Sequence, residues 1–95
     1  MIKAGSYEEA LSLVNDTRFG LTAGIMTRSL ARASHFRRNA RVGCVMVNLP
    51  TAGTDYHVPF GGRGDSSYGP REQGRSAVEF YTHVKTGYIA AGAPL

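Results

Sequence analysis

The chain has 95 residues with a formal net charge of +4, and 42% of its residues are hydrophobic. This length supports at most one small domain, and the apolar content excludes a chain that is disordered by composition. The single cysteine excludes an internal disulfide framework and is typical of a reducing compartment. Since no signal peptide and no apolar stretch near ~20 residues is visible, we expect a cytoplasmic chain without a membrane partner.

The first predicted element is a helix that begins after Ser6. Ser6 and Glu9 have the spacing of a capping box, in which both side chains accept hydrogen bonds from backbone amides near the helix start. Apolar residues then recur at helical spacing and form one face: Tyr7, Ala10, Leu11 and Val14. The pair Asn15 and Asp16 predicts the end of this helix.

A strand, a helix and a second strand follow with short connections. The apolar run at residues 21–26 predicts the first strand, and Ser29 predicts the N-cap of a helix anchored by Phe36. The β-branched run at residues 42–48 predicts a strand that is buried on both faces of a parallel sheet. Together these residues predict a βαβ unit with a right-handed crossover.

The second half of the chain is predicted to be mostly loop. Prolines and glycines recur through residues 49–68, and a loop of this length is usually functional or disordered. Pro70 predicts the first turn of a third helix. The alternating residues 82–89 predict a strand with no evident partner in the chain, followed by a frayed tail.

Three motifs in order carry a resemblance to the aldehyde dehydrogenases. Residues 15–25 resemble the family's Asn-x-x-x-(Tyr/Phe)-Gly-Leu strand entry, and residues 45–48 resemble its inner strand ending in Asn. Residues 59–62 resemble its Pro-Phe-Gly-Gly loop. The likeness covers roughly residues 5–90. Within the family, the α-ketoglutaric semialdehyde (2,5-dioxovalerate) dehydrogenases look most similar, on three stretches: residues 48–53, 55–58 and 66–74.

The resemblance implies an α/β fold in three parts. Residues 1–80 would be the terminal βαβ portion of the aldehyde dehydrogenase catalytic domain, residues 81–90 an oligomerisation strand, and residues 91–95 a tail. The parent enzyme would oxidise an aldehyde, such as a semialdehyde, to a carboxylate with NAD or NADP. In the family, the nucleophilic cysteine, the glutamate base and the cofactor domain lie upstream of this segment. We therefore expect no catalytic residue, no cofactor-binding residue and no activity from this chain alone.

The resemblance also implies roles for individual residues. Phe60 matches the aromatic residue that lines the substrate pocket, and Tyr56 and His57 match the loop at the substrate entrance. An interface strand would pair with the sheet of an identical subunit, through Thr82, Val84, Thr86 and Tyr88. The expected partners are the rest of the parent enzyme, identical subunits and a small aldehyde. One departure is Gly64, which occupies a position where the family usually has lysine.

Other interpretations of these residues stay open. Cys44 could be a nucleophile with His35 or His57 as its base, although its place in a β-branched run favours an inert thiol. The scattered histidines and cysteine fit no zinc spacing, so no metal site is expected. A basic stripe indicates a solvated helix face more than nucleic-acid binding: Arg28, Arg32, Arg37, Arg38 and Arg41. The main alternative function is a truncated, non-catalytic module that assembles through residues 82–89.

Overall fold

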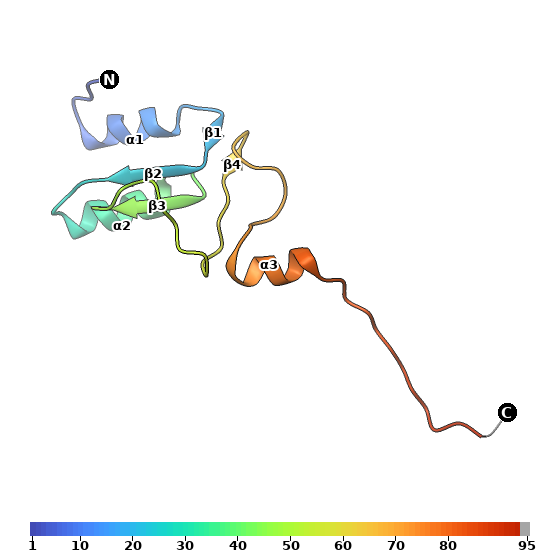
Figure 1. Ribbon diagram of the computed structural model, residues 1–95. Helices are drawn as coiled ribbons and strands as arrows, with labels where there is room; N and C mark the ends of the chain where they lie inside the picture. The colour runs from blue at the N-terminus through green and yellow to red at the C-terminus, as the bar shows by residue number, and fades with distance from the viewer. Residues whose placement is uncertain (94–95) are drawn as a thin grey trace.

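The computed structural model describes residues 1–93 (Figure 1). In chain order the elements are α1 (Tyr7–Asn15), β1 (Phe19–Gly20), β2 (Thr22–Ile25), α2 (Leu30–Asn39), β3 (Cys44–Val47), β4 (Arg63–Gly64) and α3 (Gly74–Tyr81). β2 and β3 are parallel, with α2 between them in the chain, whereas β1 and β4 form a separate antiparallel pair. The predicted α/β class is confirmed. Residues 94–95 of the predicted tail lie outside the described residues.

The start of α1 follows the predicted capping pattern, with one difference. The Ser6 hydroxyl accepts a hydrogen bond from the Glu9 amide at 3.1 Å, as a helix N-cap does. The Glu9 carboxylate instead accepts from the amide of Gly5 at 2.6 Å, one residue before the cap. At the other end, the Asn15 side chain donates to the carbonyl of Asn39 and accepts from the amide of Arg41. This side chain therefore ties the end of α1 to the end of α2.

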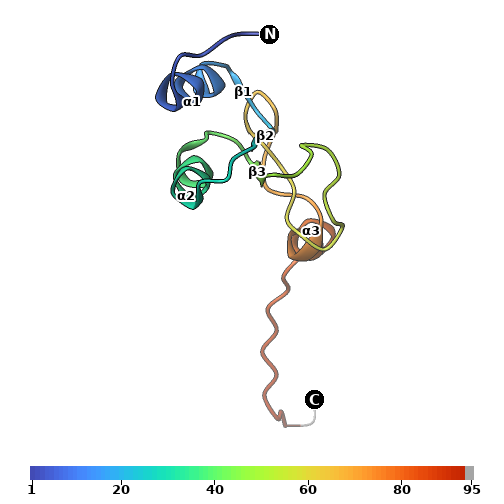
Figure 2. The ribbon, with the colours of Figure 1, turned by 90° about the vertical axis from the view of Figure 1, so that its left-hand side faces the viewer.

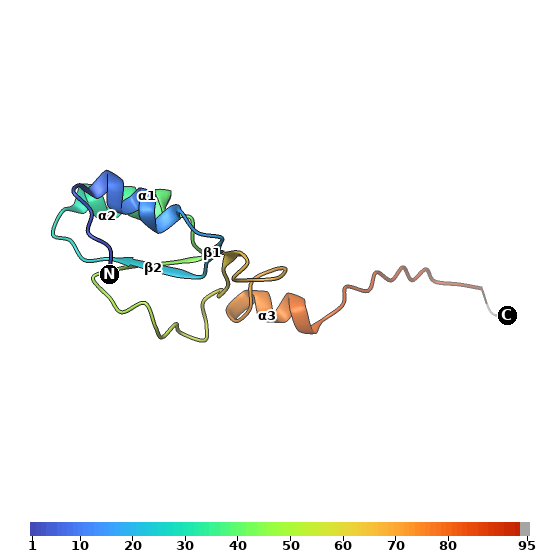
Figure 3. The ribbon, with the colours of Figure 1, turned by 90° about the horizontal axis from the view of Figure 1, so that it is seen from above.

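The core lies between the two helices and one face of the β2–β3 pair. Both α1 and α2 lie on the same side of these strands, and the loop after β3 runs on the other side (Figures 2 and 3). Phe36, Ala40 and Val42 are buried. Half-buried side chains pack around them: Tyr7, Leu11, Val14, Ala23, Ile25 and Val45. The prediction that β3 is buried on both faces is wrong for this chain, because its residues are all half-buried and helices cover only one face.

The chain as a whole is far more extended than a compact domain of its length. Its radius of gyration is 20.6 Å, whereas a compact chain of this size has about 12 Å. Its accessible surface is 8322 Å², and a folded monomer of this mass exposes about 5,300 Å². A large area therefore remains open to other protein surfaces.

Residues 82–93 account for much of this extension. After α3 they run away from the rest of the molecule as an extended segment (Figure 1). The strand predicted at residues 82–89 does not form within the described residues, since this segment lies beside no other strand. A strand needs a neighbour for its backbone hydrogen bonds, so pairing with another subunit stays a prediction.

The third helix begins later than Pro70 predicts. α3 starts at Gly74, and the segment before it exchanges backbone hydrogen bonds with Phe60 instead. The N-cap Gln73 and the first residue of α3, Gly74, have φ angles of 63° and 51°, whereas residues inside a right-handed helix have negative φ. This backbone turn separates the Phe60-paired segment from α3.

Asn48 closes the carboxyl end of the parallel β2–β3 pair. Its side chain accepts a hydrogen bond from the Thr27 amide at 2.8 Å and donates one to the Thr27 carbonyl at 2.9 Å. The side-chain amide of Asn48 thus pairs with the Thr27 backbone as a strand residue would, and it extends the β2–β3 pairing beyond the ends of the strands. Its φ of 57° is left-handed, a conformation that asparagine tolerates better than most residues.

We predict that replacing Asn48 by glycine lowers the free energy of unfolding by about 1–2 kcal/mol, because both bonds to Thr27 are lost while the left-handed backbone is kept. Asn48→Ala should cost about 1 kcal/mol more because alanine resists this φ. Urea unfolding followed by circular dichroism measures the free energy of unfolding of both variants. Leu49→Ala is the control, because Leu49 is exposed. A glycine variant as stable as the parent would show that the amide contributes nothing.

Candidate functional site

Phe60 is fixed by pairing with the segment that leads into α3. The Phe60 amide donates a hydrogen bond to the Glu72 carbonyl at 2.8 Å, and the Glu72 amide donates one to the Phe60 carbonyl at 2.7 Å. These two bonds form an isolated antiparallel bridge. The half-buried phenyl ring therefore projects from a backbone with both polar groups satisfied.

The segment from Phe60 to Gly62, which joins the Glu72 bridge to β4 and is called the Phe60–Gly62 turn below, docks against the residues that lead into β3. Gly61 is buried, and a Cβ at Gly43 would overlap its carbonyl group. The Cys44 thiol also faces this carbonyl, with 3.7 Å between Sγ and O. Glycine is required at position 43 because two backbones meet there without room for a side chain.

A hollow of about 350 Å³ opens beside this turn. Its lining combines apolar and aromatic groups with three hydroxyls and a carboxylate, from Leu21, Phe60, Gly61, Ser66, Ser67, Tyr68, Pro70 and Glu72. This volume is at the lower end of the range for small-molecule pockets. Phe60 is the predicted substrate-binding residue that contributes to it.

Tyr56 and His57 lie elsewhere on the loop. Their rings contact each other edge to face at 5.5 Å, and Tyr56 is 84% exposed. The Tyr56 carbonyl accepts from the Gly74 amide at 3.0 Å, and a Cβ at Gly74 would lie 2.5 Å from the His57 carbonyl oxygen. The structure thus places these residues against the start of α3 and does not bring them into the hollow lined by Phe60.

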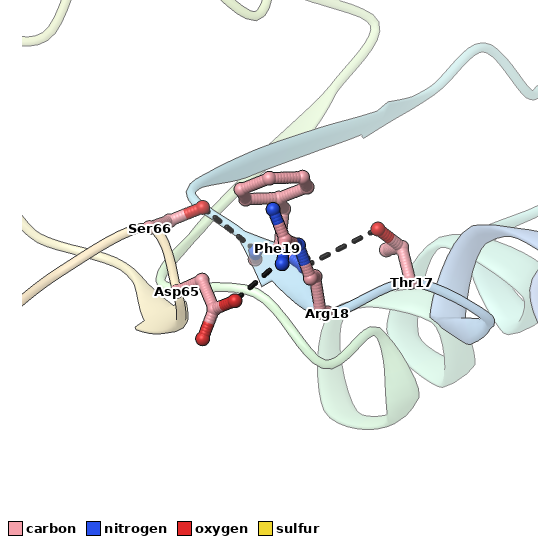
Figure 4. A network of polar contacts seen from close by, with 6 residues as sticks. Thr17, Arg18, Phe19, Asp65 and Ser66 are labelled. Carbon is pink, nitrogen blue, oxygen red and sulfur yellow. Dashed lines mark hydrogen bonds and ion pairs between the residues drawn. The ribbon is translucent and has the colours of Figure 1, made fainter.

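Polar contacts surround the β1–β4 pair, close to Leu21 and Ser66 of the hollow (Figure 4). Arg18 and Asp65 form an ion pair at 3.3 Å, and the Arg18 carbonyl accepts from the Asp65 amide. Gly64, the last residue of β4, has a φ of 54°, and a Cβ there would overlap the Arg18 carbonyl. A residue with a side chain would not fit at this position without a shift of the backbone.

Two serines of the site were not indicated by the sequence pattern. Ser66 accepts a hydrogen bond from the Gly20 amide at 2.9 Å, and Ser67 accepts from the Gly62 amide at 2.6 Å. Serines beside glycine-rich turns often bind nearby backbone amides, so their position after Gly64 was the available signal. They join the Phe60–Gly62 turn to β1.

The alternative chemistries gain no support from the geometry. The His35 ring nitrogen Nδ1 is hydrogen-bonded to the Tyr7 hydroxyl at 2.7 Å, so it is engaged away from Cys44. Within residues 1–93, no group of three or more metal-ligating side chains comes together. None of the described helices has the length and apolar character to cross a bilayer.

Comparison with known proteins identifies the class. The sequence pattern of the aldehyde dehydrogenase family matches residues 1–87. The chain is 42% identical over 89 residues to an alpha-ketoglutaric semialdehyde dehydrogenase of Bacillus subtilis strain 168, covering 94% of this chain and 18% of that protein. It is 40% identical over 89 residues to an alpha-ketoglutarate semialdehyde dehydrogenase of Haloferax volcanii, covering 93% and 18%.

The fold agrees with this match. A protein of Sinorhizobium meliloti 1021 that was crystallised with NAD superimposes with a TM-score of 0.84 at 31% identity, over 95% of this chain and 19% of that one. The chain therefore belongs to the aldehyde dehydrogenase family. It spans about a fifth of the length of these relatives. The predicted resemblance, including the semialdehyde dehydrogenase subgroup, is confirmed.

We predict that Gly43→Ala displaces the Phe60–Gly62 turn, because the new methyl group would occupy the space of the Gly61 carbonyl. The rate of Cys44 alkylation by iodoacetamide in the 95-residue chain measures this, since Cys44 is its only thiol. We expect a rise of about tenfold or more, the factor for losing one well-made contact. Gly87→Ala, in the extended segment with open space around its Cα, is the control. Unchanged alkylation in Gly43→Ala would contradict the docking.

Proposed function

We propose that this chain is the C-terminal part of an NAD(P)-dependent aldehyde dehydrogenase and that Phe60 forms a wall of its substrate pocket. The observation that carries the proposal is the fixed Phe60 backbone beside a hollow of about 350 Å³. An aromatic ring on a rigid turn can hold an aldehyde in place and exclude water from it. Tyr56 and His57 would lie nearer the entrance, since they are exposed on the preceding loop.

A semialdehyde is the substrate class that we propose. The relatives from Bacillus subtilis and Haloferax volcanii are semialdehyde dehydrogenases by name, and they match nearly the whole chain. The net charge of +4 favours approach of a substrate that bears a carboxylate.

The cofactor would be held by the rest of the enzyme. When bound there, NAD or NADP accepts the hydride from the substrate. The Gly62 amide already donates a hydrogen bond to the Ser67 hydroxyl and is therefore not free to bind a phosphate. No residue of this chain is therefore assigned to the cofactor or to the nucleophile.

The extended segment would provide the subunit contact. We propose that residues 81–90 add a strand to the sheet of a neighbouring subunit, through Thr82, Val84, Thr86 and Tyr88. Val84 and Tyr88 are 97% and 95% exposed, and burying such side chains stabilises an assembly. In this division, residues 1–80 belong to the catalytic domain and residues 91–95 form the tail.

A chimera tests the proposed function. The segment of the Bacillus subtilis relative that matches this chain would be replaced by residues 1–95, and NAD(P)H formation from α-ketoglutaric semialdehyde would be followed. We predict an active chimera, in which Phe60→Ala raises KM for the aldehyde about tenfold and leaves KM for the cofactor within about twofold. Phe19→Ala is the control, since this exposed phenylalanine lies outside the hollow.

An inactive but folded chimera would exclude the proposed function and leave the assembly module as the better interpretation. Equal loss of aldehyde and cofactor affinity in Phe60→Ala would mean that the ring supports the fold without forming the pocket. Aldehyde-dependent NAD(P)H formation by the 95-residue chain alone would contradict the assignment of the nucleophile and cofactor to other parts of the enzyme.

We predict that Tyr88→Asp in the same chimera raises the dissociation constant of the oligomer by about tenfold or more, because it buries an unpaired charge between strands. Analytical ultracentrifugation measures the constant, and Tyr88→Phe, which keeps the ring, should leave it unchanged. An unaltered assembly in Tyr88→Asp would place the subunit contact elsewhere.

A further inference from the structure

The guanidinium of Arg71 lies across the Phe60–Gly62 turn. Its Nη1 atom donates a hydrogen bond to the Gly62 carbonyl at 3.1 Å. A Cβ at Gly61 would lie 2.9 Å from both Cδ and Nη1 of Arg71, and one at Gly43 would lie 2.5 Å from Nη1. The half-buried side chain therefore packs on two glycines and covers the point where the turn meets the residues before β3.

Among residues 1–93, no acidic side chain pairs with Arg71, and the ion pair in the structure joins Arg18 to Asp65. The partner of Arg71 is a backbone carbonyl, and a hydrogen bond from a charged donor to a carbonyl is stronger than a neutral one. The planar guanidinium also fits flat against glycine backbone, which the compact ammonium of lysine does not do as well.

Arg71 acts on the same turn as its neighbour Glu72. The Glu72 backbone holds Phe60 through two hydrogen bonds, and the Arg71 side chain holds Gly62 two residues further on. Residues 71–72 thus bind both ends of the turn, and its middle residue, Gly61, packs against Gly43. Without the hydrogen bond from Arg71 to Gly62, residues 71–72 would hold the turn only through the backbone bridge between Glu72 and Phe60.

We propose that Arg71 is a positioning residue that fixes the direction of the Phe60 ring and thereby sets aldehyde selectivity. The part that concerns selectivity rests on the proposed function above. The part that concerns the turn is a property of this chain and can be measured without catalysis.

The first experiment uses the 95-residue chain and its single thiol. Cys44 Sγ faces the Gly61 carbonyl, so loosening of the turn exposes it. Arg71→Met keeps the length of the side chain and removes its donors. We expect it to accelerate Cys44 alkylation about tenfold, the factor for one charge-assisted hydrogen bond. Arg71→Lys should restore part of the protection through its single ammonium.

Arg75→Met is the matched control, because Arg75 is an exposed arginine of α3 only four residues away. It should leave alkylation unchanged. Equal alkylation rates for the parent chain and Arg71→Met would overturn the proposal, as would an equal effect of Arg75→Met. Unfolding curves accompany each variant, and acceleration that merely follows global destabilisation would also overturn it.

The second experiment places the same variants in the chimera. Arg71→Met should raise KM for the aldehyde about tenfold, change the ranking of short against long aldehydes, and leave KM for the cofactor within about twofold. A similar rise of KM for the aldehyde and KM for the cofactor would show that Arg71 supports the fold and does not set selectivity. If the chimera without further substitution is inactive, the proposed function fails, whereas the alkylation rates still decide whether Arg71 holds the turn.

Discussion

The close approach of Gly61 to Gly43 is the constraint on which the site depends. Two backbone segments meet there with no room for a side chain on Gly43, and the Arg71 side chain occupies the space beside Gly61. This contact brings a distant loop to the entry of β3, and the Glu72 bridge and the Ser67 hydroxyl then complete the hydrogen bonds of the turn. The position of Phe60 follows from these bonds, since its own backbone has no freedom left.

The contacts that hold the site are mostly backbone hydrogen bonds, and the visible ion pair contributes little. The Arg18 and Asp65 side chains are 75% and 56% exposed, and exposed pairs of this kind stabilise by about 0–1 kcal/mol. The backbone bonds around them join β1 to β4, and Gly64 permits the turn that this pairing needs.

The packing of the chain is one-sided. Helices α1 and α2 cover one face of the β2–β3 pair, and just three side chains among the described residues are buried hydrophobics. The other face, the extended residues 82–93 and the exposed Val84, Tyr88 and Ile89 leave apolar area in water. Since burial of such area is the main stabilising contribution in folding, these surfaces favour contact with further protein.

The sequence by itself determined the local elements and the family. Ser6 and Ser29 cap their helices, Phe36 is the buried anchor, and the three motifs in order identify an aldehyde dehydrogenase. These features could be predicted because each signal is contained within a few consecutive residues. Contacts between distant residues were decided only by the tertiary structure. The pairing of Phe60 with Glu72 delays α3, and Arg71 lies over Gly43 across 28 residues of sequence. No short sequence pattern predicts such contacts, since they depend on how the whole loop folds back on the sheet.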